Sequence, residues 1–127
     1  MNIDLLQRPQ RHKWGCLSLP ALLNAGDLNG AAACFARNAC LVTQDATAIH
    51  GRDQIRPALA QLIARGTQIE VALSNVLVAG DVAWARERWT IRAEGPEGSR
   101  FESTANPVLV MHRIEGRWKL AIAVPWH

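Results

Sequence analysis

The chain has 127 residues, of which 49% are hydrophobic and 20% are charged, and its formal net charge is +3. This length and composition predict one globular domain that can bury a core without disulfides or metals. Apolar runs such as residues 76–79 are too short to cross a bilayer, and the basic residues do not alternate with aromatics as in a nucleic-acid surface. We therefore expect neither a membrane nor a nucleic acid as partner.

Residues 1–16 are predicted to form an irregular segment, because Pro9 and mixed polarity leave no sustained hydrophobic period there. The segment also lacks the apolar core and small-residue cleavage site of a secretory signal. The three cysteines, Cys16, Cys34 and Cys40, are odd in number and have no metal-binding spacing. Free thiols in a reducing compartment are the simplest interpretation, so we expect a cytoplasmic protein.

The first half of the chain is predicted to be mainly helical. The expected elements are helices at residues 18–26, 27–38 and 54–65, a short strand at 40–43, and a turn region with another short extended piece at 45–51. Pro20 is tolerated in the first turn of the first helix, and Asp27 is a good N-cap for the second. Gly66 is expected to end the third helix as a C-terminal cap.

The second half has the period of two that is typical of strands. Strands are predicted at residues 68–79, 82–94, 101–114 and 117–125, separated by glycine-containing turns. Three helices followed by a four-stranded antiparallel meander predict an α+β fold, with the helices gathered on one face of the sheet.

The strand at 82–92 carries a tryptophan and charge on both faces, whereas a half-buried strand normally has one apolar face. One face holds Val82, Trp84, Arg86, Arg88, Thr90 and Arg92, and the other holds Ala83, Ala85, Glu87, Trp89 and Ile91. The arginines can therefore line an enclosed space, or they can face water or a partner subunit, and the sequence leaves both open.

The chain resembles SnoaL-like domains in four segments that follow one another in the family's order. These are N-A-G-D-L-N-G-A-A-A-C-F-A (24–36), H-G-R-D-Q-I-R (50–56), V-A-G-D-V-A-W-A-R (78–86) and E-G-R-W-K-L-A-I-A-V-P-W (115–126). The family belongs to the nuclear transport factor 2-like, cystatin-like superfamily, which includes ketosteroid isomerases and polyketide cyclases. The resemblance implies that residues 17–127 form a cone, in which a strongly curved antiparallel sheet wraps the helices around a pocket, and that a homodimer forms across the outer sheet face.

The resemblance does not extend to the ketosteroid isomerase mechanism. The position that matches the family's carboxylate base is Thr43, and the second acid falls at Val110. The oxyanion tyrosine has no equivalent, because the chain contains no tyrosine. A base without its oxyanion donors would lose orders of magnitude in rate.

Five residues are candidates for ligand binding. The resemblance places Arg86, and nearer the rim Arg88, where related proteins meet their ligands, and an arginine fork suits a carboxylate or enolate. Trp84 and Trp126 are candidate apolar walls of the pocket. Thr43 joins them as the position that matches the family's base.

Asp45 and His112 are the candidate acid and base. A buried carboxylate at Asp45 would have a raised pKa suited to proton transfer, whereas the alternative is a turn in which Asp45 bonds its own backbone. His112 can titrate near neutral pH, but a lone histidine on a strand is more often structural. The four histidines lack metal-binding spacing, and no cofactor motif is present, so neither a metal nor a cofactor is expected.

These features predict a small-molecule protein whose pocket takes a small apolar or cyclic ligand with an acidic or carbonyl group. The activity, if there is one, is a cofactor-independent isomerisation, cyclisation or hydration. The alternative is a non-catalytic dimerisation or ligand-sensing module, in which the arginines are structural.

Overall fold

The computed structural model describes residues 19–43 and 45–125, apart from the side chains of residues 73 and 74. Its helices are α2 (Leu19–Asn24), α3 (Leu28–Ala33) and α4 (Arg52–Ala64), and a 3₁₀ turn, η2, spans Pro96–Gly98. Its strands are β1 (Phe35–Val42), β2 (Ala48–His50), β3 (Gln68–Ala79), β4 (Val82–Glu94), β5 (Arg100–Ala105), β6 (Val108–Ile114) and β7 (Arg117–Val124). The predicted irregular segment 1–16 lies outside the described residues.

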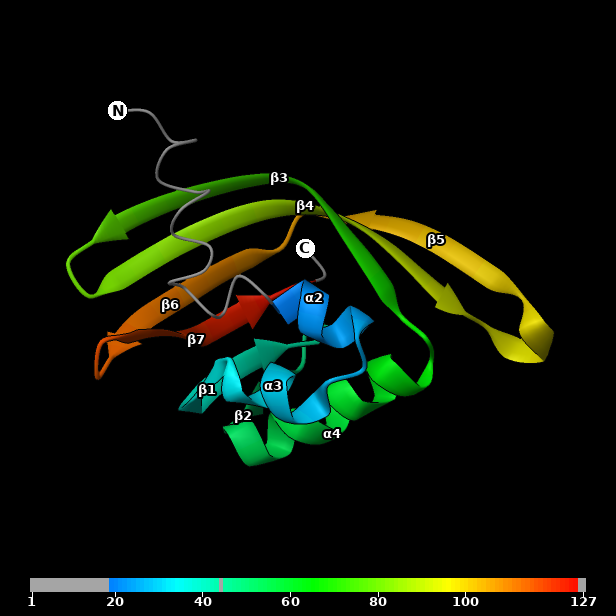
Figure 1. Cartoon of the computed structure of the whole chain (residues 1–127), viewed down its shortest axis with the longest axis horizontal. Helices are drawn as coiled ribbons and strands as arrows, with labels where there is room; N and C mark the ends of the chain where they lie inside the picture. The colour runs from blue at the N-terminus through cyan, green and yellow to red at the C-terminus, as the bar shows by residue number, and fades with distance from the viewer. Residues whose placement is uncertain (1–18, 44, 126–127) are drawn as a thin grey trace.

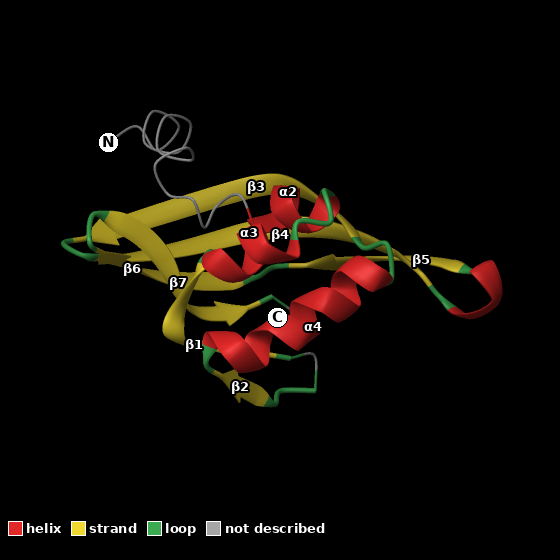
Figure 2. Cartoon of the chain, turned by 60° about the horizontal axis from the view of Figure 1, so that its bottom comes forward, coloured by secondary structure: helices red, strands yellow, loops and turns green. Residues whose placement is uncertain are grey.

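All of these strands belong to one curved sheet, whose order is β2-β1-β7-β6-β4-β3, with β5 paired to β4 (Figure 1). Every pair is antiparallel except β1 and β7, which run parallel. The three helices cover the concave face of the sheet (Figure 2). The predicted α+β class is confirmed, but the sheet is mixed because β1 joins the meander at β7.

The core lies between the helices and the concave face. Its fully buried large side chains include Phe35 from β1, Ile55 and Leu59 from α4, and Leu109 and Leu120 from the sheet. Ile55 and Leu59 are one helical turn apart, so a single face of α4 packs on the sheet, as the spacing predicted.

The predicted helix at residues 27–38 is wrong beyond Ala33. Asp27 caps the helix as expected, since its carboxylate accepts a hydrogen bond from the N–H of Gly30 at 2.9 Å. The chain then leaves the helix and becomes β1, in which Phe35 pairs with Leu120 of β7. Phe35 is fully buried against the sheet. This burial outweighs the local helix preference, which differs between ordinary residues by only about 0.5 kcal/mol per residue.

The predicted strand at residues 101–114 is two strands in the structure. β5 pairs with residues 89–94 of β4, and β6 pairs with residues 82–86 of the same strand. The interruption falls at Asn106 and Pro107, because proline has no N–H to donate to a ladder. The long strand β4 therefore carries two successive partners along one edge.

The third helix ends as the sequence predicted. Gly66 has a φ of +65°, and its N–H donates to the carbonyl of Ile63 at 3.0 Å. The N–H of Thr67 donates to the carbonyl of Leu62 at 3.1 Å, which completes the two-bond cap of a Schellman motif. The cap turns the chain sharply, so that Arg65 and Thr67 lie beside the start of β3.

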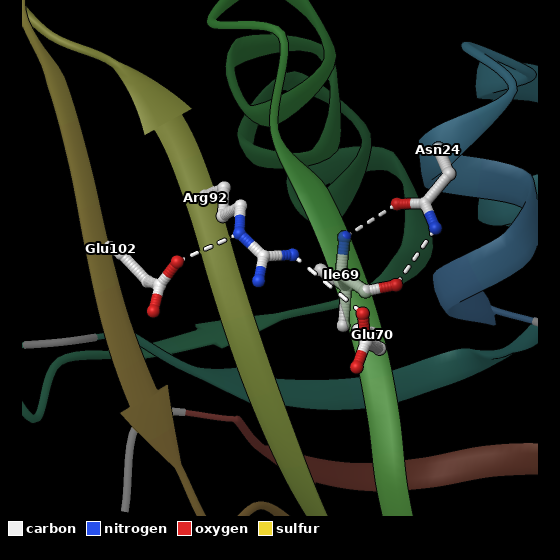
Figure 3. Close-up of polar contacts among 5 residues, drawn as sticks. All are labelled: Asn24, Ile69, Glu70, Arg92 and Glu102. Atoms are coloured by element: carbon white, nitrogen blue, oxygen red, sulfur yellow. Dashed lines mark hydrogen bonds and ion pairs between the residues drawn. The ribbon is translucent and has the colours of Figure 1, made fainter.

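The side chain of Asn24 joins α2 to the edge strand β3 (Figure 3). Its Nδ2 donates to the carbonyl of Ile69 at 2.8 Å, and its Oδ1 accepts from the N–H of Ile69 at 2.7 Å. At this point the amide takes the place of a neighbouring strand, because β3 lies at the edge of the sheet.

Replacing Asn24 by alanine should lower the free energy of unfolding by about 1–3 kcal/mol, because two partly buried backbone groups lose their partner. Urea unfolding followed by circular dichroism measures this change. The matched control is Asn75→Ala on β3, the strand to which Asn24 bonds, where the side chain is exposed and a change below about 0.5 kcal/mol is expected. Equal effects of the two substitutions would contradict the bridging role of Asn24.

Candidate functional site

A pocket of about 250 Å³ lies between the helices and the concave face of the sheet. This volume is close to the lower end of small-molecule sites, which run from about 300 to 1,000 Å³. Its lining comes from α2, α4 and six of the strands and their flanks, and comprises Leu19, Leu23, Phe35, Leu41, Thr43, Ala58, Leu59, Gln61, Leu62, Arg65, Thr67, Ile69, Trp89, Ile91, Ala93, Phe101, Ser103, Leu109, Ala123 and Pro125.

Burial separates the interior of this pocket from its mouth. Phe35, Leu59 and Leu109 are almost completely buried, and the interior is apolar apart from the buried Thr67. Gln61, Arg65 and Ser103 are exposed, and so is Phe101, so the mouth carries polar groups beside one exposed aromatic ring. An apolar cavity with a few polar groups at one end is the usual form of a site for a small organic molecule.

Trp89 forms one wall, and a buried carboxylate holds its ring in place. Its Nε1 donates to Oε1 of Glu87 at 2.8 Å, and both side chains are only 2% exposed. Glu87 itself does not line the pocket. It acts on the site through the indole, whose rotation would break a buried hydrogen bond.

Thr43 lines the pocket from the end of β1, and it is linked to Asp45. The hydroxyl of Thr43 donates to Oδ1 of Asp45 at 2.5 Å, and the same carboxylate oxygen accepts from the N–H of Thr47 at 3.2 Å. These bonds match the alternative interpretation of this segment, a turn in which Asp45 bonds its own backbone.

Asp45 differs from the buried base that a proton-transfer site would need. Its side chain is exposed and is not part of the pocket lining. Hydrogen bonds from the side chain of Thr43, and then from Thr47, hold its pKa below the ordinary value of 3.8. The expected raised pKa is therefore wrong, because the carboxylate lies in water with donors around it.

Arg86, Arg88 and Trp84 do not line the pocket. Along β4 the odd-numbered residues from Ala83 to Ala93 are buried, while Arg86 and Arg88 are exposed and Trp84 is half-buried. Successive side chains of a strand point to opposite faces, so these three residues lie on the outer face of the sheet. Their expected placement in the pocket is wrong, because the neighbouring residues of the strand, one position along, face the interior instead.

His112 also lies on the outer face. On β6 the side chains of Leu109 and Met111 are buried, and His112 is exposed between its cross-strand neighbours Val82 and Lys119. The structure therefore does not bring His112 and Asp45 together at the pocket. The remaining candidate, Trp126, lies outside the described residues.

The pocket residues that sequence reasoning missed lie on the other face of the same strand. Trp89, Ile91 and Ala93 line the pocket, and all are buried. A signal was present, because the face with Arg86, Arg88 and Arg92 carries three cations whereas the opposite face carries a single charge, on Glu87. The face with less charge is the better candidate for the interior.

Among the described residues, Cys34 and Cys40 form no disulfide. Burial raises the pKa of the Cys34 thiol to about 11, so it stays protonated and is a poor nucleophile at neutral pH. Within residues 19–43 and 45–125, no group of His, Cys, Asp or Glu side chains is arranged to hold a metal ion, and no helix is long and apolar enough to cross a membrane.

Residues 18–120 match the model of the SnoaL-like domain. The chain belongs to this family. The resemblance found in the sequence is thereby confirmed. No curated protein matches the chain.

Solved structures share the fold of this SnoaL-like domain at low sequence identity. A protein of unknown function from Mycobacterium tuberculosis has a TM-score of 0.79 at 18% identity, over 96% of this chain and 72% of that one. A candidate dehydratase of the nuclear transport factor 2-like family from Streptomyces avermitilis has a TM-score of 0.77 at 18% identity, over 96% and 95%. A ketosteroid isomerase-like protein from Erwinia carotovora atroseptica has a TM-score of 0.76 at 13% identity, over 92% and 95%. At such identities the likeness establishes the fold and not an activity.

Replacing Thr43 by valine should raise the pKa of Asp45 toward 3.8, because the hydrogen bond that lowers this pKa most is removed. Since the folded-state pKa is lowered, the hydrogen bonds of Asp45 stabilise the fold above pH 3.8, and this stabilisation is lost as the pH falls through the lowered pKa. Carboxyl-carbon NMR over an acid titration measures the shift. Thr104→Val, at an exposed threonine on β5, is the control and should leave it unchanged; a wild-type pKa at or above 3.8 would contradict the arrangement.

Proposed function

We propose that this SnoaL-like domain binds a small, mostly apolar organic molecule in the pocket between α4 and the sheet. The observation that carries the proposal is an apolar cavity of about 250 Å³ whose one wall, the indole of Trp89, is held by the buried carboxylate of Glu87. Empty apolar volume in a core costs stability, because its lining loses packing contacts. A ligand that fills the cavity recovers that loss.

The chemistry that such a pocket suits is proton transfer without a cofactor, as in an isomerisation, a cyclisation or a hydration and its reverse. Two neighbours in fold are described as a candidate dehydratase and as ketosteroid isomerase-like, which supports this class without selecting a reaction. Thr43 is the proposed polar contact inside the pocket. Because its hydroxyl donates to Asp45, its oxygen is left as an acceptor for a ligand, and Asp45 is proposed as the residue that orients it.

Filling the pocket should abolish binding. Ala58 is half-buried and lines the pocket from α4, so Ala58→Phe places a ring in the ligand volume and should weaken binding at least about tenfold. A panel of apolar carboxylic acids, amides and ketones, screened by thermal shift and followed by calorimetry, supplies the ligand. Ala64→Phe is the control, because this residue is exposed on the same helix outside the pocket lining. Retained binding in Ala58→Phe would remove the pocket as the site.

The second candidate function is a dimerisation module, with or without a ligand in the pocket. The supporting observation is the outer face of the sheet, where no described helix packs and where Leu77, Val82 and Ile122 are 55%, 43% and 43% exposed. Their apolar side chains lie on β3, β4 and β7, close to the half-buried Trp84. Apolar surface of this kind favours association with a second copy of the chain, so we propose a homodimer.

Ile122→Arg should shift the protein from dimer to monomer, because a charge at the centre of an apolar contact must be desolvated. Light scattering coupled to size-exclusion chromatography, at several concentrations, measures the mass. Gln54→Arg, at an exposed position of α4, adds the same charge away from the sheet and should leave the mass unchanged. A wild-type protein that is monomeric at all concentrations would contradict the dimer.

The proposed compartment is the cytoplasm. Its support is that Cys34 and Cys40 form no disulfide among the described residues, since reduced cysteines persist where glutathione and thioredoxin are present.

A further inference from the structure

Arg65 is the one charged side chain among the described residues that line the pocket. It lies at the mouth, just past the last residue of α4, whereas the buried lining side chains are apolar apart from Thr67. Gln61, one turn earlier on the same helix, and Ser103 on β5 are the neighbouring polar groups of the lining. The mouth therefore presents one positive charge and two uncharged hydrogen-bonding groups beside the exposed ring of Phe101.

The backbone of Arg65 is held on both sides. Its N–H donates to the carbonyl of Gln61 at 3.1 Å, and its carbonyl accepts from the N–H of Glu94 at 3.1 Å. The following residue, Gly66, has the left-handed conformation that ends the helix. The backbone of Arg65 is therefore fixed between α4 and β4, and its long side chain can change rotamer to reach a ligand.

No described carboxylate neutralises Arg65. The ion pairs among the described residues are made by Arg92 and Arg113. On β4 the exposed Glu94 alternates with the buried, pocket-lining Ala93, so the side chain of Glu94 points to the opposite face of the strand. Arg92, by contrast, already contacts Glu102 and Glu70 on the outer face (Figure 3). Within the described part of the chain, the donors of Arg65 are therefore available for a bound anion.

We infer that the ligand is an apolar carboxylic acid, which buries its hydrocarbon part against Trp89 and leaves its carboxylate at the mouth with Arg65. This inference rests on the proposed pocket function and adds the ligand's charge and its orientation. A planar guanidinium matches a carboxylate with two parallel N–H donors and stays charged at every physiological pH. The opposite orientation would bury a carboxylate among apolar side chains, which is strongly unfavourable.

Arg65 also has a structural alternative, since a cation at the C-terminus of α4 interacts favourably with the helix dipole. The two roles differ in what they predict. A dipole partner changes stability and affects acidic and neutral ligands alike, whereas an anion-binding residue discriminates between them.

The test uses matched acid and amide probes, 2-naphthoate with 2-naphthamide and octanoate with octanamide, titrated by calorimetry into the full-length protein. The wild type should bind at least one acid about tenfold more tightly than its amide. Arg65→Gln should remove that preference and leave the amide affinity unchanged, and added salt should weaken only the acid. Arg88→Gln, on the outer face, is the control and should change nothing. The naphthyl and octyl pairs separate a cyclic from a chain-like acid.

The outcomes distinguish this inference from the function on which it rests. If each amide binds as tightly as its acid, or Arg65→Gln weakens both alike, acid recognition by Arg65 is overturned and the apolar pocket remains. If no probe binds and no compound of the thermal-shift panel stabilises the wild type, the proposed function fails and the inference fails with it.

Discussion

Strand β4 hydrogen-bonds to three other strands, and the strict alternation of its side chains decides what lies inside the molecule. β3 pairs along one edge, and β6 and then β5 pair along the other. Because the strand is shared in this way, its register cannot slip by one residue without turning the core face to water. Trp89 and Ile91 are interior for this reason, and Arg86 and Arg88 are exterior.

The pocket exists because the helices are tied to this sheet at their ends and do not fill the concave face completely. Asn24 attaches the end of α2 to β3, and Nε of Arg52 attaches the start of α4 to the carbonyl of Phe35 at 2.9 Å. The cap at Gly66 fixes the other end of α4. Between these attachments Ile55 and Leu59 pack on the sheet, while Ala58 is too small to close the space beside them. A rigid frame around an unfilled apolar volume is what a ligand site requires.

Much of this arrangement was predictable from local patterns. The third helix, its glycine cap and the β3–β4 hairpin follow from apolar spacing and turn chemistry, and the family follows from short motifs in order. The end of the second helix was not predictable in this way. The residues from Phe35 onward pass from helix to strand because β7, far away in sequence, pairs with them. A contact of that range leaves no local periodicity to read.

The residues of the candidate site also differ in whether the sequence predicts them. Thr43 was predicted through the resemblance to the family, and it lines the pocket. Arg65 was not singled out, because at the end of a helix an arginine has an ordinary structural explanation. Arg65 lies at the mouth because the end of α4 is next to the start of β3 and to the paired strands β4 and β5. Only folding brings these segments together.

The sequence alone determined the class of fold, the family and the two faces of the long strand, because these depend on residue type and on a period of two. Which of the two faces is interior was decided by the tertiary structure. Burial is a property of the whole sheet and of the helices packed on it. The lower charge of one face favours that face as the interior, but a strand with a tryptophan on each face does not decide between them. The candidate site therefore differs from the predicted one. Arg86 and Arg88 lie on the outer face, whereas Trp89 and, among the described charged residues, Arg65 alone line the pocket.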